Sequence, residues 1–277
     1  MKLGWLSDLH LNFLDAPGRR RFIEELAERP VDAWLFSGDL GEAPTVGTYL
    51  QELDTLLPVP LYFVLGNHDF YRGSIAGVTD ELEALSRTRN GLVWLTAAEP
   101  QLLAPDLAVV GDDGWGDARL GDPLGSLVLF NDFFLIQELT GHQRPELIRR
   151  LNLLGDESVR RLGPKLEEAA EQCRNVVLVT HVPPFEGACW HEGSTSSEGW
   201  LPWLTCAAVG RAILDVAGRH AATSFLVLCG HTHSPGRYAP APNVVVYTAG
   251  AAYGHPTIQA SVEFDGTSIG FAVWRDR

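Results

Sequence analysis

Aspartate, asparagine and histidine residues recur in this sequence just after short apolar runs, and these residue types together suit a divalent metal ion. Imidazole nitrogen and carboxylate oxygen are ligands of Zn, Mn and Fe. No cysteine belongs to the set, so a structural zinc site is not indicated. Five runs end in such a group: Asp8 with His10, Asp39, Asn67 with His68 and Asp69, His181, and His231 with His233.

The spacing within these groups supports a shared site. Asp8 and His10 stand two positions apart, as do His231 and His233, so an extended backbone would direct each pair to one side. Glycine precedes three of the groups and permits tight turns. Each motif alone is weak, because a single histidine is more often a packed or surface residue. Five groups in succession, each at the end of an apolar run, favour one metal site.

Alternating apolar and amphipathic segments supply the elements that must position these residues. The alternation predicts an α/β fold whose first strands are parallel. In open α/β sheets, ligands bind beyond the carboxyl ends of the strands. The expected strands are 3–7, 31–37, 61–65, 176–180, 225–229, 244–248, 258–264 and 268–274, and the expected helices are 19–27, 45–57, 80–86, 133–154, 157–173 and 207–217.

The middle of the chain is less regular. Residues 111–125 read as a Gly- and Asp-rich loop, and Gly163-Pro164 should interrupt the helix predicted over 157–173. Residues 182–204 read as a long loop with three tryptophans. No repeat, low-complexity tract or linker divides the sequence. We therefore expect a single domain over residues 1–277, with a cap or lid insertion at about 111–165.

The five groups resemble the signature of the calcineurin-like metallophosphoesterases, and the match extends over about residues 3–250. The resemblance implies a four-layer α/β/β/α sandwich with two packed mixed β-sheets and a dimetal site at the carboxyl ends of the strands. It also implies the metal ligands: Asp8, His10 and His233 for one ion, Asn67, His181 and His231 for the other, and Asp39 as the bridge between them.

The resemblance implies that His68 is catalytic and that Asp69 orients it. The order of the residues agrees, because His68 follows Asn67 directly and cannot easily bind the same metal. It is free to stabilise developing charge or to protonate the leaving oxygen.

The expected reaction is hydrolysis of a phosphate mono- or diester by a metal-bridging hydroxide. The positive charge of two divalent ions exceeds the negative charge of two carboxylates and a hydroxide, so the site attracts an anionic ester even though the chain is acidic. The ions can also hold the ester for in-line attack. A nucleotide pyrophosphatase-type hydrolase and a non-catalytic scaffold of the same fold are the alternatives. The resemblance suggests Mn or Fe, and Zn is possible.

Substrate contacts are expected from the irregular segments. Trp115 and Arg119 could lie at the rim of the cleft, where Arg119 would grip a phosphate. A salt bridge between Arg119 and a nearby aspartate is an equal alternative. Arg72 could also reach substrate. The tryptophans of the 182–204 loop, Trp190, Trp200 and Trp203, could stack on an aromatic leaving group, although attachment of the loop to the core is favoured.

Composition limits the class of protein. The 277 residues are 45% hydrophobic and 20% charged, as in globular proteins. The formal net charge of −14 disfavours nucleic acid as a partner. No segment has the roughly 20 apolar residues that cross a bilayer, and MKLGWLSDLH does not resemble a signal peptide. The four cysteines have no zinc-like spacing. We expect a cytoplasmic enzyme, and we expect its substrate to be a small-molecule or nucleotide phosphate ester. Its oligomeric state stays open.

Overall fold

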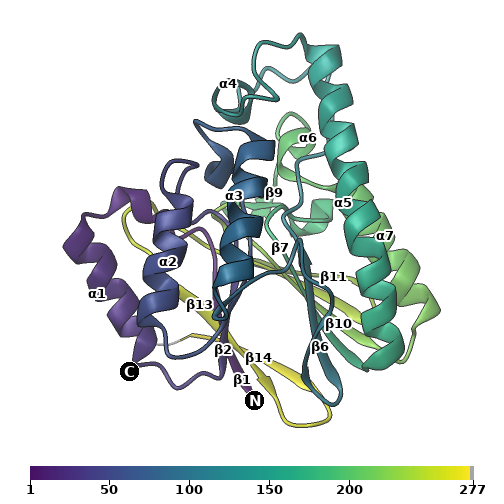
Figure 1. Cartoon of the computed structure of the whole chain (residues 1–277). Helices are drawn as coiled ribbons and strands as arrows, with labels where there is room; N and C mark the ends of the chain where they lie inside the picture. The colour runs from purple at the N-terminus through teal and green to yellow at the C-terminus, as the bar shows by residue number, and fades with distance from the viewer. Residues whose placement is uncertain (275–277) are drawn as a thin grey trace.

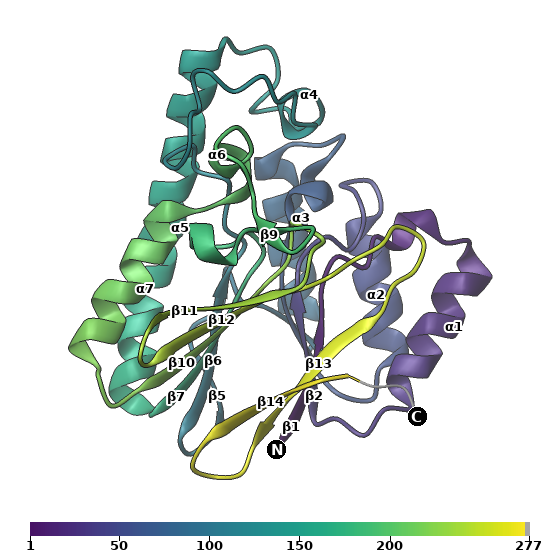
Figure 2. The ribbon, with the colours of Figure 1, turned by 180° about the vertical axis from the view of Figure 1, so that it is seen from behind.

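Two six-stranded mixed β-sheets lie face to face, and helices cover their outer faces (Figures 1 and 2). The computed structural model describes residues 1–274. The last three positions of the domain expected over 1–277 therefore lie outside the described residues. This architecture confirms the predicted α/β/β/α sandwich.

The first sheet has the order β14-β13-β1-β2-β3-β4, and the second has the order β11-β12-β10-β7-β6-β5. The strands of the first sheet are β1 (Lys2–Leu6), β2 (Ala33–Ser37), β3 (Leu61–Val64), β4 (Leu92–Trp94), β13 (Ile258–Phe264) and β14 (Ile269–Val273). Those of the second are β5 (Gln101–Ala104), β6 (Leu107–Asp112), β7 (Asn175–Thr180), β10 (Ser224–Cys229), β11 (Gly236–Ala241) and β12 (Val244–Thr248).

Helices α1 to α3 lie outside the first sheet, and α5 and α7 lie outside the second (Figure 1). The α-helices are α1 (Ala16–Ala27), α2 (Val46–Leu56), α3 (Ile75–Thr88), α4 (Asp132–Leu135), α5 (Arg144–Gln172), α6 (Leu201–Leu204) and α7 (Ala207–Arg219). Short elements between them are the 3₁₀ turns η1 (Leu11–Phe13), η2 (Asn67–Phe70) and η3 (Glu186–Ala188) and the hairpin strands β8 (Trp190–His191) and β9 (Ser194–Thr195).

Alternate residues of the central strands enter different cores, which produces the layers. In β2, Leu35 joins a cluster that both sheets share, whereas Trp34 and Phe36 pack with residues of the helices outside the first sheet. In β7, Val177 joins the shared cluster and Leu178 packs with residues of α5 and α7. Both faces of these strands are buried, as expected for parallel strands between two apolar layers. Each such side chain contributes roughly 1.5–3 kcal/mol on burial.

The middle of the chain differs from the predicted elements. The helix α5 continues through Gly163 and Pro164, because Pro164 lies on an exposed face of the helix where water can satisfy the freed carbonyl group. Residues 144–165 of the expected insertion belong to this helix, which covers the second sheet, while residues 113–143 are mostly irregular. The 182–204 loop contains η3, the β8–β9 hairpin and α6. The edge strand β11 was missed because its Arg-Tyr-Ala-Pro sequence lacks an apolar run.

Asp113, just beyond β6, joins the ends of the two sheets near the predicted site. Its Oδ1 accepts hydrogen bonds from Leu65 N at 2.7 Å, Trp94 Nε1 at 3.0 Å and Thr96 Oγ1 at 2.6 Å. Burial raises the pKa of this carboxyl to about 6, and the charge of Asp112 adds to the increase. The protonated form of this carboxyl therefore persists in the folded protein up to about pH 6.

In Asp113→Asn, the free energy of unfolding should fall less than in the wild type as the pH rises. The pKa of Asp113 is about 6 in the folded protein and 3.8 ordinarily, so protonation of its carboxyl stabilises the fold. This stabilisation is complete below pH 3.8 and is lost as the pH rises through 6. The shift corresponds to about 3 kcal/mol. Asparagine keeps the acceptor oxygen and does not titrate. Urea unfolding of chelator-treated protein at low and high pH measures the difference, with exposed Asp122→Asn as the control. An unchanged pH dependence in Asp113→Asn would contradict this account.

Candidate metal centre

The loops that follow β1, β2, β3, β7 and β10 meet at one edge of the paired sheets. They bring together all seven residues that the sequence predicted as metal ligands. The first sheet supplies Asp8, His10, Asp39 and Asn67, and the second supplies His181, His231 and His233.

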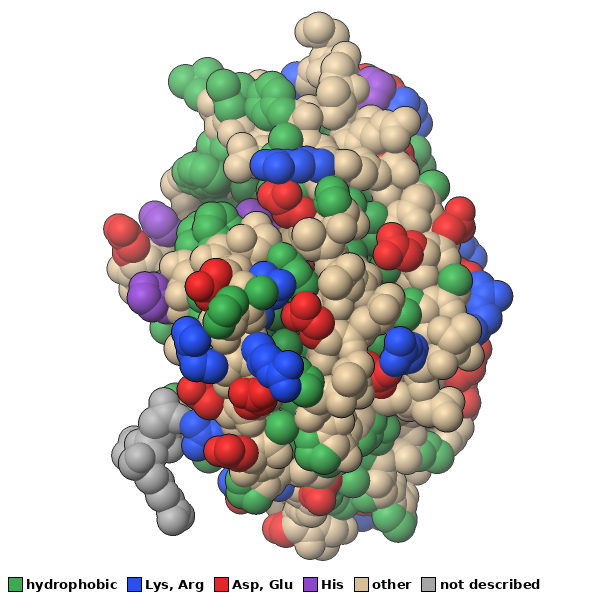
Figure 3. Space-filling view, turned by 60° about the vertical axis from the view of Figure 1, so that its left-hand side comes forward, with side chains coloured by type: hydrophobic (Ala, Val, Ile, Leu, Met, Phe, Trp, Pro, Cys, Tyr) green, Lys and Arg blue, Asp and Glu red, His purple; other side chains and the backbone are tan. Residues whose placement is uncertain are grey.

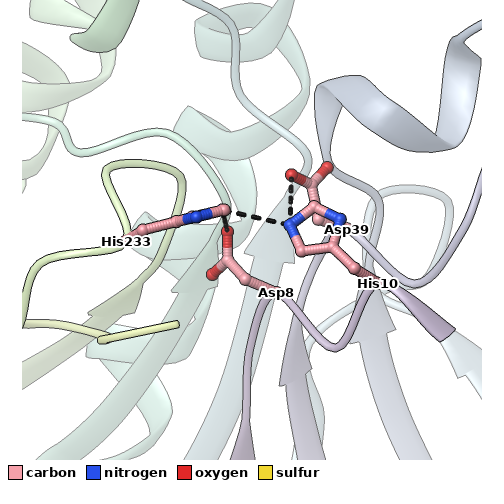
Figure 4. A group of neighbouring side chains, drawn as sticks. All are labelled: Asp8, His10, Asp39 and His233. Carbon is pink, nitrogen blue, oxygen red and sulfur yellow. Dashed lines mark hydrogen bonds and ion pairs between the residues drawn. The ribbon is translucent and has the colours of Figure 1, made fainter. Parts of the chain in front are cut away.

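One group of these side chains is compact enough to surround a single ion (Figure 4). One ligand atom from each of Asp8, His10, Asp39 and His233 lies within 4.8 Å of the others. His10 Nε2 lies 3.0 Å from His233 Nε2. His233 Nε2 lies 3.4 Å from Asp8 Oδ1, and His10 Nε2 lies 3.7 Å from Asp39 Oδ2.

A second group surrounds the ring of His181. Its Nε2 lies 3.1 Å from Asn67 Oδ1 and 3.2 Å from His231 Nδ1. The same nitrogen lies 3.4 Å from Asp39 Oδ2. The Asp39 carboxylate is thus adjacent to both groups.

The protonation states suit metal binding. Burial lowers the pKa of His10 to about 4. Burial, followed by the charge of His181, lowers the pKa of His231 to about 3. Both rings are therefore neutral near pH 7 and can offer a lone pair. Burial would also lower the pKa of His181, but the Asp39 carboxylate raises it to about 10, so a proton there occupies a position suited to a cation.

The donor set fits divalent metal. The imidazole nitrogens of His10 and His233 face each other, and only one proton can lie between them. A cation there would satisfy both lone pairs and the adjacent Asp8 oxygen. Two carboxylates, one amide oxygen and the imidazole nitrogens form a mixed oxygen and nitrogen set of the kind that binds Mn, Fe or Zn.

The backbone at these residues is strained. Asp8, His10, Asp39, His231 and His233 all have positive φ angles, between 43° and 72°. The extended backbone expected for the Asp8–His10 and His231–His233 pairs is therefore wrong. Consecutive turns, and not strand alternation, bring the side chains of each pair together. Left-handed conformations of residues other than glycine cost about 1–3 kcal/mol each and concentrate at functional sites.

Two glycines are required by space at this edge. A Cβ at Gly66 would overlap the carboxylate of Asp39, and a Cβ at Gly230 would overlap that of Asp8. The tight turns predicted from the sequence are thus only part of the role of these glycines. The missing side chains at Gly66 and Gly230 also allow the carboxylates of Asp39 and Asp8 to lie against a neighbouring loop.

Comparison with known proteins identifies the family. The profile of the calcineurin-like phosphoesterases matches residues 1–235. The chain belongs to this family. No curated protein matches the sequence. Family membership makes the chain a metal-dependent phosphoric ester hydrolase with two divalent ions.

Solved structures share the phosphoesterase fold. A phosphopantetheinyl hydrolase from Mycobacterium tuberculosis is 19% identical, with a TM-score of 0.64 over 90% of this chain and 89% of that one. A dimetal phosphatase from Danio rerio is 14% identical, with a TM-score of 0.62 over 99% of each chain. A protein from Thermus thermophilus is 13% identical, with a TM-score of 0.56 over 98% of each. At these identities the likeness concerns the fold.

His68 lies beside the two clusters of candidate metal ligands, the one around His10 and His233 and the one around His181, which we call the metal groups. Its Nε2 is 4.0 Å from Asp39 Oδ2, and its side chain is 17% exposed. The ring stacks on Tyr71, with 4.3 Å between centroids and 29° between planes. The ring also lines the cavity in front of the site. It can therefore meet a substrate while the residue before it, Asn67, faces His181.

Asp69, expected to orient His68, contacts the backbone of the neighbouring loops. Its carboxylate accepts hydrogen bonds from the backbone N–H groups of Asp39, Leu40, Gly41 and Gly66 at 2.8–3.0 Å. Among the described residues it receives no hydrogen bond from the His68 ring. Asp69 therefore acts on the site by holding the loops after β2 and β3 together.

Asp132 of α4 is a buried site residue that the sequence did not reveal. Its Oδ1 accepts hydrogen bonds from Asn67 Nδ2 and from Tyr71 Oη, each at 2.7 Å. Tyr71 Oη also accepts one from Asn67 Nδ2 at 3.0 Å. The Asn67 amide is thereby oriented with Oδ1 toward His181, and Tyr71 is held beneath His68. Asp132 lies in an irregular segment 65 positions from Asn67, and no local pattern marks it.

Asp132→Ala should weaken metal binding by about 10- to 100-fold, the range for loss of a residue that orients a ligand. The Asn67 amide would lose the partner that holds its oxygen toward the site. Asp132→Asn keeps an acceptor oxygen for both donors and should restore most of the affinity. Calorimetric titration of chelator-stripped protein with Mn²⁺ compares them. Equal affinity in the alanine variant and the wild type would refute the role.

The tentative substrate residues lie elsewhere. Trp115 is buried and contacts the Phe70 ring at 5.1 Å. Arg119 forms ion pairs with Asp117 at 3.2 Å and Asp156 at 2.7 Å, which is the alternative that the sequence left open. Arg72 is 65% exposed and pairs with Glu42. None of the three is among the described residues that line the cavity.

A cavity of about 570 Å³ opens on the metal groups. Its walls include the exposed Trp200 and the β8–β9 hairpin, both from the predicted 182–204 loop. Trp203 is buried, and the Trp190 ring fills the space beside Gly236. Two of the three tryptophans therefore attach the loop to the body, as favoured from the sequence, and one faces the cavity.

None of the helices that the structure describes has the length and apolar character needed to cross a membrane.

Proposed function

We propose that the chain hydrolyses a phosphate monoester or diester at two divalent ions. Asp8, His10 and His233 would hold one ion and Asn67, His181 and His231 the other, and Asp39 would bridge them. The observation that carries this proposal is the position of Asp39 Oδ2, 3.7 Å from His10 Nε2 and 3.4 Å from His181 Nε2. When bound, the ions supply positive charge for the phosphoryl oxygens and a hydroxide nucleophile.

The residues around the ions have distinct tasks. The His68 ring, exposed to the cavity and supported by Tyr71, would stabilise charge or give a proton to the leaving oxygen. Asp69 would keep the backbone beneath Asp39 and Asn67 in place. The irregular segment 113–143 would serve as the cap within a single domain, since it carries Asp132 to Asn67 and Phe130 to the cavity.

Two finer points belong to the same proposal. We expect Mn or Fe, with Zn as a third possibility, from the oxygen and nitrogen ligands. We also expect a cytoplasmic enzyme, which is supported by the four cysteines, Cys173, Cys189, Cys206 and Cys229, that are all free and buried.

The test compares a chromogenic phosphate monoester with the matching diester. Chelator-stripped protein is reloaded with Mn²⁺, Fe²⁺ or Zn²⁺ and assayed with each ester. We expect hydrolysis of at least one ester that disappears again with chelator, and the favoured ester assigns the substrate type. Failure with both esters, when two bound ions per chain are demonstrated, would overturn the proposal.

A further inference from the structure

The cavity in front of the metal groups is lined by aromatic, histidine and neutral polar side chains. Among the described residues that form its wall, none is Lys, Arg, Asp or Glu. The chain as a whole has a formal net charge of −14, so no distant excess of basic residues compensates. With metals bound, the positive charge of the cavity would be concentrated at its inner end.

Basic residues near the cap are engaged elsewhere. Arg119 pairs with two aspartates, and Arg72 pairs with Glu42. Arg144 donates hydrogen bonds to the carbonyl groups of Ser126 and Val128 and lies over the Trp203 ring, 4.8 Å from its centroid. A second phosphoryl group beyond the metal site would find no arginine or lysine among the lining residues. Such a group would lose hydration without gaining a partner of opposite charge.

Aromatic rings flank both metal groups. Tyr253 lies 4.6 Å from the ring of His10, measured between centroids, beside the first group. Phe130 lies 5.7 Å from the ring of His231, beside the second. Trp200 continues the wall at 6.4 Å from Phe130 and is 44% exposed. A large tryptophan that stays exposed at a cavity mouth offers a flat face for stacking.

Exposed apolar side chains continue the Phe130 side of the cavity along the chain. Leu127, Leu129 and Phe134 are all exposed. Figure 3 shows hydrophobic side chains gathered near the top of the molecule, the end at which α4 lies in Figure 1. The opposite wall is polar and includes His191, Ser194 and Thr195 of the β8–β9 hairpin.

From this lining we infer, as an extension of the proposed phosphoesterase function, that the substrate carries a single phosphoryl group on an uncharged organic group with a flat apolar ring. Polyphosphates and dinucleotide polyphosphates are poor substrates. The phosphoryl group would lie at the metals, the ring against Trp200 and Phe130, and neutral polar atoms near the hairpin. The volume of about 570 Å³ is within the range of small-molecule sites.

The test uses three substrates with one type of leaving alcohol: ethyl phosphate, 2-(1-naphthyl)ethyl phosphate and 2-(1-naphthyl)ethyl diphosphate. We expect kcat/KM for the naphthyl monophosphate to exceed that for ethyl phosphate by about 10-fold or more, from one stacked ring. The diphosphate should be at least about 10-fold poorer than the monophosphate, because its additional charge meets no arginine or lysine among the described lining residues. Trp200→Ala should reduce the naphthyl preference, whereas exposed Leu153→Ala on α5 should not change it.

Binding provides a second measurement. Calorimetry on the metal-loaded protein compares naphthylmethylphosphonate with methylphosphonate, and the naphthyl compound should bind about 10-fold more tightly. Absence of naphthyl preference, or preference for the diphosphate, would overturn this inference and leave the phosphoesterase proposal intact. Absence of hydrolysis of every substrate with two metals bound would overturn both.

Discussion

His68→Ala lowers kcat by a factor of about 10² to 10⁴, the usual contribution of a general acid–base group, while both metal ions stay bound. The ring of His68 lines the cavity and lies 4.0 Å from Asp39 Oδ2. It takes no part in the contacts that join Asn67, His181 and His231. Removing it should therefore leave the metal groups intact and remove only a group that faces the substrate.

Steady-state kinetics and metal analysis of the same preparation test this expectation. His142→Ala is the matched control, because His142 lies outside the cavity lining and should change neither quantity. An unchanged kcat would contradict the catalytic role of His68. Loss of one metal equivalent would instead show that His68 is needed for metal binding.

Asp39→Asn should reduce metal affinity by more than the roughly 10- to 100-fold that residues supporting a ligand contribute. The substitution keeps the size of the side chain and the oxygen that accepts a hydrogen bond from His68 N at 2.9 Å. It removes the charge of the carboxylate whose Oδ2 lies near both His10 and His181. Hydrolysis should fall with metal occupancy, and the second ion should be lost more readily than in the wild type.

The same variant should change the titration of His181. Burial opposes protonation of this ring, and the Asp39 charge raises its pKa to about 10 in the metal-free chain. Without that charge, only the Asp8 charge and the Ser37 carbonyl group still oppose the effect of burial, so the pKa of His181 should fall. NMR titration of metal-free protein measures this, with Asp156→Asn as the control. Two tightly bound ions in Asp39→Asn would contradict the bridging role.

The residues proposed as metal ligands could be located from the sequence because each lies within a few positions of a strand end. Asp39 follows β2 and His181 follows β7, so an apolar run marks where each must lie. The four layers were implied by family resemblance, and the fully buried β2 and β7 are consistent with them. Local sequence was thus enough to place these residues at one edge of the sheets, although it did not reveal the left-handed backbone that directs their side chains.

Residues that act across long sequence separations could not be predicted. Asp132 meets Asn67 only after the cap segment folds over η2, and the helix expected over 133–154 did not indicate this contact. Arg119 could have contacted substrate or a neighbouring acid, and Asp117, two positions away, competes for it. The choice depended on where α5 places Asp156, a position that lies between the helices expected over 133–154 and 157–173.

The two sheets meet the metal site from opposite ends of the sequence, which has a consequence for the order of folding. His10 and His233 are 223 positions apart, as are Asp8 and His231. Contacts of such separation require closure of a very long loop and depend on completion of slowly formed parallel pairings. A chain that has built only β1 to β4 has a partial set of ligands. Metal uptake during refolding should therefore mark the final docking of β10, and a nascent chain should acquire its full metal complement only after His233 has been synthesised.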